Sequence, residues 1–128
     1  MHRSSRCLFA AAAFMSLALP AAASAESFPS LAEQGYSVSV LGPGKFGGLG
    51  WVVSKGNEQF FCRIRASLAY VGEKDMVSFS KSGRIVTLNR AVFESSLGRP
   101  DSTLPQLADL QAGHPRPADV GTCSPLAK

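Results

Sequence analysis

The first 25 residues constrain the fold most, because their pattern marks a segment that does not belong to the folded protein. Arg3 and Arg6 give a short positive start, and residues 7–19 form an almost unbroken apolar run. That run is shorter than the roughly 20 residues that span a bilayer. Small residues follow, and residues 23–25 match the A-x-A cleavage pattern. We therefore expect a secretory signal peptide that is cleaved after Ala25.

The alternative for this segment is a buried N-terminal helix, which the order of charged, apolar and small residues disfavours. The short basic start and the alanine-rich run are typical of bacterial signals, so we expect a periplasmic or secreted protein. No second apolar run approaches membrane length, and no transmembrane segment is expected in the mature chain. Cleavage leaves residues 26–128, enough for a single small exported domain. Its net charge falls to +2, with 11 Lys and Arg against 9 Asp and Glu.

Two cysteines, Cys62 and Cys123, remain in the mature chain. In an oxidising compartment two cysteines most simply form one disulfide. Such a bond would close a loop of about 60 residues, for which the chain-entropy estimate is about 4 kcal/mol of stabilisation. The alternative is a reactive thiol, but no histidine or basic cluster adjoins either cysteine in sequence. We expect the disulfide, which would tie the C-terminal tail to the middle of the domain.

Alternating apolar and polar residues predict an antiparallel sheet in the middle of the chain. In residues 59–65, Phe60 and Cys62 share one face, while Phe61, Arg63 and Arg65 share the other. The cysteine would face the core and the arginines would face solvent. We expect a mainly β (α+β) single domain, an antiparallel β-meander of about five strands within residues 36–89. The expected strands are residues 36–40, 51–53, 59–65, 77–80 and 85–88, and residues 66–71 fit a strand or a helix equally well.

Short helices are expected on both sides of the sheet region. Before it, residues 30–33 have the form of a capping box, and Gly35 is a stop signal. After it, in a helical and proline-rich tail of residues 90–128, residues 91–97 precede a stop at Gly98. Residues 103–106 form a second capping box, before a helix with Leu107 and Leu110 that ends at Gly113. Residues 114–117 are expected to be an extended, polyproline-like segment leading to Cys123.

Residues 41–51 hold five glycines, and Gly42, Gly44 and Gly47 match the spacing G-x-G-x-x-G of dinucleotide-binding loops. Such a loop must open a helix, whose N-terminus attracts the pyrophosphate. Here a β-prone segment follows, and glycines at this density would make a poor helix. A phosphate-binding Walker A loop is also disfavoured, because Phe46 follows Lys45 where Ser or Thr is required. We expect a mobile hairpin connection whose glycines supply positive φ angles.

No recognisable catalytic or metal-binding pattern is present. The single histidine of the mature chain, His114, lies in a proline-flanked segment without partners at ligand spacing. No serine occurs in a nucleophile motif, and the carboxylates are scattered. Glu73 and Asp75 flank Lys74 in an expected turn, where a solvated pair is favoured over an acid–base couple. We expect no enzymatic activity, no cofactor and no metal.

The charges are unevenly distributed along the chain. Residues 45–90 hold eight basic and three acidic residues, a net charge of +5, whereas the flanking segments are mildly acidic. A basic sheet face with aromatic residues such as Phe61 is able to bind an anionic envelope polymer or a lipid headgroup. The alternative is that outward positions are charged for solubility and to protect strand edges. The groups that we place on this anionic-ligand face are Arg63, Arg65, Lys81, Arg84 and Trp51.

These observations favour a non-enzymatic exported protein that binds an envelope or extracellular partner, an anionic polymer or a protein. Nucleic acid is not expected as a partner outside the cytoplasm. One alternative is a structural or stress-related envelope protein without a specific ligand. Another is a proteinaceous inhibitor of a secreted enzyme, which would present the loop of residues 42–50 as its contact.

Overall fold

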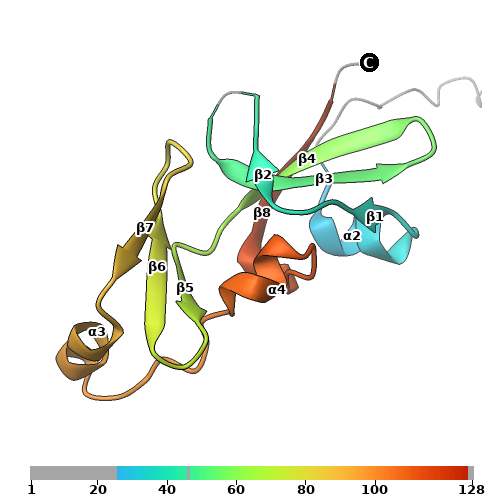
Figure 1. Ribbon diagram of the computed structural model, residues 1–128. Coiled ribbons are helices and arrows are strands. Elements are labelled where there is room, and N and C mark those ends of the chain that lie inside the picture. Colours follow the sequence, from blue (N-terminus) through green and yellow to red (C-terminus); the bar gives the residue numbers. More distant parts are fainter. Residues whose placement is uncertain (1–25, 46, 127–128) are drawn as a thin grey trace, which may run out of the picture.

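The computed structural model describes residues 26–45 and 47–126 and places eight strands in two antiparallel sheets (Figure 1). Sheet A has the order β1-β3-β4-β8, with β2 also paired to β3, and sheet B has the order β5-β6-β7. The predicted signal peptide, residues 1–25, lies outside the described residues. The expected class, a small domain of mainly antiparallel β structure with few short helices, is confirmed. The strands are β1 (Ser37–Val38), β2 (Gly42–Pro43), β3 (Leu49–Lys55), β4 (Glu58–Ile64), β5 (Leu68–Val71), β6 (Asp75–Phe79), β7 (Ile85–Leu88) and β8 (Val120–Pro125).

The hairpin of β3 and β4 is the centre of sheet A, and its alternating sequence explains its orientation. Trp51 lies opposite Cys62 and Val53 lies opposite Phe60, so these four side chains share the face that is buried. Phe61 and Arg63 lie at the intervening positions of β4 and face the other way, as the two-residue period of a strand requires. Sequence alone therefore predicts the two faces of β4 correctly, but not the orientation of Trp51 in β3.

One hydrophobic core joins the two sheets. Trp51 and Val53 of sheet A pack in the same cluster as Ala69 and Val77 of sheet B. Leu31 from helix α2 (Phe28–Glu33) and Leu110 from helix α4 (Leu107–Gln111) complete this cluster. In Figure 1, α4 lies between the two sheets, and α2 lies beside β1 and β3. Among the described residues, no helix is sufficiently long and apolar to pass through a membrane.

The three α-helices form near the predicted places, but two of the predicted caps are wrong. Helix α2 is capped by Ser27, whose side chain accepts a hydrogen bond from the Ser30 N–H at 3.2 Å, so Ser30 lies inside the helix. This earlier start brings Phe28 into the core together with Leu31. Helix α4 begins after Gln106, which makes no side-chain cap, and Thr103 lies outside the helix with its hydroxyl hydrogen-bonded to Asp101.

Helix α3 (Arg90–Leu97) matches its prediction closely. The Asn89 side chain accepts a hydrogen bond from the Val92 N–H at 3.0 Å, and Gly98 ends the helix in the left-handed conformation. No residue of α3 is buried, in contrast to α2 and α4.

The main difference from the sequence analysis is the strand β8. The tail was expected to reach Cys123 as an extended segment, whereas it forms a short 3-10 helix η2 (Pro117–Asp119) and then pairs with β4. Buried Asp119 fixes this junction: its carboxylate accepts hydrogen bonds from Arg116, and its carbonyl accepts one from the Arg65 N–H at 2.7 Å. Residues 66–71, left open between strand and helix, contain strand β5.

Candidate functional site

The glycine-rich segment forms a hairpin connection, as predicted. Gly42 pairs with Gly50 and Pro43 pairs with Leu49, so β2 and β3 run antiparallel on either side of it. The Gly44 N–H donates to the Gly48 carbonyl at 3.0 Å, which closes the turn. Because a strand follows the glycines, no helix N-terminus is available here to bind a pyrophosphate.

Two side chains of β4 lie directly against these glycines. A Cβ atom added to Gly44 would lie 2.7 Å from the Phe61 ring, and one added to Gly48 would lie 2.7 Å from the Arg63 guanidinium. Real Cβ contacts are longer than this, so the absence of side chains allows Phe61 and Arg63 to cross the hairpin. From the sequence, these glycines were expected only to supply positive φ angles. Gly47 and Gly48 do have positive φ, but Gly44 and Gly50 do not.

A groove of about 330 Å³ lies beside Phe61 on the face of sheet A that is turned away from the core. One wall is the β2–β3 connection, and the other is the C-terminal part of β8, where Ser124 pairs with Phe61. The apolar part of the lining comes from Phe61, Pro125 and Leu126. Its polar part includes two cations. The complete lining is Gly44, Lys45, Gly47, Phe61, Arg63, Ser124, Pro125 and Leu126.

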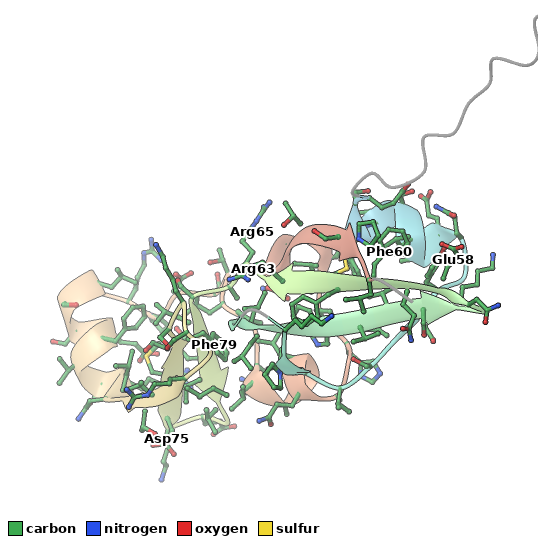
Figure 2. All side chains as sticks on the ribbon, turned by 90° about the horizontal axis from the view of Figure 1, so that it is seen from above. Glu58, Phe60, Arg63, Arg65, Asp75 and Phe79 are labelled. Atoms are coloured by element: carbon green, nitrogen blue, oxygen red, sulfur yellow. A yellow bond between two sulfur atoms is a disulfide. The ribbon has the colours of Figure 1, made fainter. Side chains whose placement is uncertain are left out.

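The two cations of this groove, Lys45 and Arg63, form no salt bridge in the described part of the chain. The salt bridges found there join Arg90 to Glu94 and Arg116 to Asp119. Figure 2 shows Arg63 where the two sheets meet, with Glu58 at the opposite end of β4 and Asp75 at the far end of β6. The groove therefore offers positive charge to a ligand.

Arg65 lies in a different hollow from Arg63, although both arginines are exposed. Between Cys62 and Ile64 the register shifts, because three steps along β8 lie opposite two steps along β4, and β4 ends at Ile64, one residue before Arg65. Arg65 lines a hollow of about 390 Å³ together with Phe28 of α2 and Val120 of β8. The alternation of residues 59–65 predicts one face for both arginines, but Arg65 lies beyond the end of β4 and lines a different hollow from Arg63.

Lys81 and Arg84 belong to the turn between β6 and β7, and both are exposed. This turn packs against the glycine hairpin: a Cβ atom added to Gly83 would lie 3.3 Å from the Gly48 nitrogen. Gly48 thus contacts Arg63 on one side and the turn that carries Lys81 and Arg84 on the other. Residues that are far apart in sequence are brought to one end of sheet A.

Trp51 is not part of the anionic-ligand face, and its assignment there was wrong. Its side chain has no exposed surface, and its Nε1–H donates to the Leu110 carbonyl at 2.8 Å. The period of β3 places Trp51 on the same face as Val53, toward the core. Lys45 was not predicted as a site residue. The signal that would have found it is its position among glycines, which leave room for the side chains of β4.

The predicted disulfide between Cys62 and Cys123 is present and fully buried. The two cysteines face each other across β4 and β8. This bond fixes β8, and therefore one wall of the groove, to the strand that carries Phe61 and Arg63.

The groups considered for catalysis are dispersed. His114 is exposed, and its backbone N–H donates to the Asp109 carbonyl at 2.9 Å. Glu73 lies in the β5–β6 turn and Asp75 begins β6, both exposed. In the ranges that the structure describes, no three His, Cys, Asp or Glu residues are grouped as metal ligands require.

Comparison with other proteins yields no relative: no protein-family model matches the sequence, and neither a curated protein nor a solved structure matches the chain.

Proposed function

We propose that this chain is an exported, non-enzymatic binding module of the bacterial envelope that holds an anionic ligand with an apolar part. The observation that carries this proposal is the groove beside Phe61, where an apolar lining adjoins the cations Lys45 and Arg63. A lipid headgroup with its first acyl carbons, or an acylated anionic polymer, has this combination of chemistry. The buried Cys62–Cys123 disulfide supports export, because such bonds persist in oxidising compartments.

The groove also supports a division of roles among its residues. The Arg63 guanidinium presents several donors in a fixed plane and is suited to a phosphate or carboxylate, whereas Lys45 acts as a mobile point charge. Phe61 and Leu126 would cover the apolar part of the ligand. The two acids nearest in sequence to Arg63 are five and ten residues away: Glu58 begins β4 and Glu73 lies in the β5–β6 turn.

The test is titration calorimetry with a short-chain, monomeric phosphatidic acid. We expect binding that weakens as salt is raised, and a loss of about tenfold in affinity for Arg63→Gln, the size typical of one charge-assisted contact. Lys45→Gln should weaken binding less. The control is Lys55→Gln, at the opposite end of β3, which should leave the affinity unchanged.

Arg65→Gln separates the groove from a wider basic face. If the groove is the site, Arg65→Gln binds like the unmodified protein, because Arg65 lines a different hollow. A broad polymer-binding surface would instead lose retention on a heparin column in both arginine variants. Binding that is unaffected by Arg63→Gln and Lys45→Gln together would refute the groove as the site.

A further inference from the structure

Sheet B has one open edge. Strand β7 is the last in the order β5-β6-β7, and its outer side faces away from sheet A (Figure 1). The opposite edge of the sheet is partly covered, because the Tyr70 N–H of β5 donates to the Pro105 carbonyl at 2.9 Å. Within the described ranges, no strand pairs with the outer side of β7.

The hairpin register shows which backbone groups of β7 face this edge. The Ser80 N–H donates to the Arg84 carbonyl at 2.9 Å, so these two residues form a hydrogen-bonded pair. Hydrogen-bonded and non-hydrogen-bonded pairs alternate along an antiparallel ladder. Ile85, opposite Phe79, is the first residue of β7 after Arg84. Thr87, opposite Val77, follows two positions later. Ile85 and Thr87 are therefore at non-hydrogen-bonded positions.

The N–H and C=O groups of Ile85 and Thr87 consequently point away from β6. The neighbouring strand agrees with this register, because the Phe79 N–H donates outward to the Ser67 carbonyl on the β5 side. No hydrogen-bond partner for the outward groups of Ile85 and Thr87 is found among residues 26–45 and 47–126. Four backbone groups are thus arranged as in a sheet that lacks its next strand.

The side chains around this edge are unusually apolar. Ile85 is 42% exposed and Val86 is 41% exposed. The following helix α3 adds Val92 and Leu97, which are also exposed. Natural edge strands are commonly protected by Lys, Pro or a bulge, and β7 has none of these within its four residues.

The surrounding charge indicates what kind of segment fits. Lys81 and Arg84 precede β7, Arg90 and Arg99 follow it, and Glu94 is the one acid between residues 81 and 99. Glu94 is already engaged by Arg90 at 2.8 Å. A second copy of this chain would bring the same positive charge to the contact, whereas an acidic segment would be attracted.

We propose that β7 receives an extended segment of a partner protein as a fourth strand of sheet B. That segment alternates apolar and hydroxyl side chains and carries Asp or Glu at its ends. Backbone hydrogen bonds to Ile85 and Thr87 supply affinity, and the charged ends select the partner. This surface is separate from the groove beside Phe61, so either proposal stands without the other.

The probe is a blocked ten-residue peptide with three Thr-Val repeats between pairs of Glu, and its counterpart has pairs of Lys instead. We expect the Glu peptide to bind at least about tenfold more tightly than the Lys peptide at low salt. Amide hydrogen exchange of the purified protein should slow at Ile85 and Thr87 when the Glu peptide is added. The Val86 amide, which already faces β6, serves as the internal control.

Two variants test the geometry and the charge separately. Thr87→Pro removes an outward donor without removing a bond to β6, and should reduce peptide affinity by about tenfold or more. Its fold is checked by circular dichroism. Arg84→Glu, an exposed change that removes most of the local positive charge, should largely abolish the preference for the Glu peptide.

Three results would overturn the proposal. One is equal binding of both peptides, and another is binding that leaves the Ile85 and Thr87 amides exchanging at their original rates. The third is a dimer, seen by sedimentation without peptide, that protects these two amides and would make a second copy the occupant.

Discussion

Residues without side chains shape the candidate site. Gly44 and Gly50 lie beneath the Phe61 ring, and a Cβ atom at either position would approach its carbons to 2.7 Å. At Gly50 the added atom would also meet the Cys62 carbonyl oxygen, which belongs to the backbone of β4 and has no room to move. Gly42, in the same segment, has open space on that side and no positive φ.

Gly50→Ala should therefore destabilise the protein by about 1–3 kcal/mol, the usual cost of overpacking. Gly42→Ala is the matched control and should change the free energy of unfolding by less than about 0.5 kcal/mol. Urea unfolding of the two variants makes the comparison. Equal stability of the two would show that the close approach of β3 and β4 does not constrain position 50.

A second residue-scale prediction concerns Asp101. Its carboxylate accepts hydrogen bonds from the side chain and the backbone N–H of Thr103, at 2.6 Å and 3.0 Å, which lower the pKa of Asp101. A carboxyl whose pKa is lowered by folding stabilises the protein above its unfolded value of about 3.9, and this contribution disappears as the pH falls through the folded value.

Asp101→Asn should accordingly be less stable than the unmodified protein at pH 7. The two should converge in stability as the pH falls below the unfolded value of about 3.9 and the native carboxyl takes up its proton. Thermal unfolding measured across this range gives the comparison. A difference in stability that stays constant down to pH 2 would refute the role of the ionised carboxylate.

Elements far apart in sequence are joined by the Trp51 indole. Its hydrogen bond to the Leu110 carbonyl connects β3 to α4 inside the core, at 2.8 Å. The same helix contacts β5, so this bond helps to hold the two sheets together. A buried carbonyl without a partner costs more than the bond itself contributes.

Trp51→Phe should lower the free energy of unfolding by about 2–4 kcal/mol, from the lost packing and the unpaired carbonyl. The control is Tyr36→Phe, since no hydrogen bond of the Tyr36 hydroxyl is found within the described ranges, and the expected change is under about 0.5 kcal/mol. Guanidinium titration followed by circular dichroism measures both. If Trp51→Phe lowers the free energy of unfolding no more than Tyr36→Phe does, then α4 shifts so that a water molecule donates a hydrogen bond to the Leu110 carbonyl.

The elements differ in how well the sequence predicts them, for physical reasons. Strands β3 and β4 are rich in β-prone residues around a short turn, and α3 carries its own cap and stop, so local patterns suffice to predict that these elements form. Strand β8 reads Val-Gly-Thr-Cys-Ser-Pro, in which few residues favour a strand. It is a strand because β4 and the disulfide hold it, and neither influence is visible in residues 120–125 alone.

The site illustrates the same limit at the scale of the whole molecule. Alternation correctly places Phe61 and Arg63 on the outer face of β4, but it also predicts that Arg65 joins them. The strand ends at Ile64, and Arg65 lines a different hollow. Lys45 lines the groove because the β2–β3 hairpin places it beside β4. Sequence periodicity does not encode this contact between segments. The disulfide was predictable from the two cysteines that remain after residue 25 and from the expected oxidising compartment, because its existence does not depend on register.

Removal of the Cys62–Cys123 disulfide, which links positions 61 residues apart, tests how far the stability of the whole molecule depends on this bond. We expect Cys62→Ala combined with Cys123→Ala to lower the free energy of unfolding by about 4 kcal/mol, from the freed unfolded chain. Because the cysteines lie in the core, the reductant should act only slowly on the folded protein. A double variant as stable as the native protein would show that β8 pairs with β4 without covalent help.

The Cys62–Cys123 disulfide also determines the effect of a single proteolytic cut in the backbone. The basic turn at Lys81 and Arg84 is exposed and suits trypsin-like proteases, and it lies between the two linked cysteines. A molecule nicked there remains one covalent particle, and its halves separate only when a reductant is added. A cut in this turn would thus leave β8, one wall of the candidate groove, still attached to β4, the strand that carries Phe61 and Arg63.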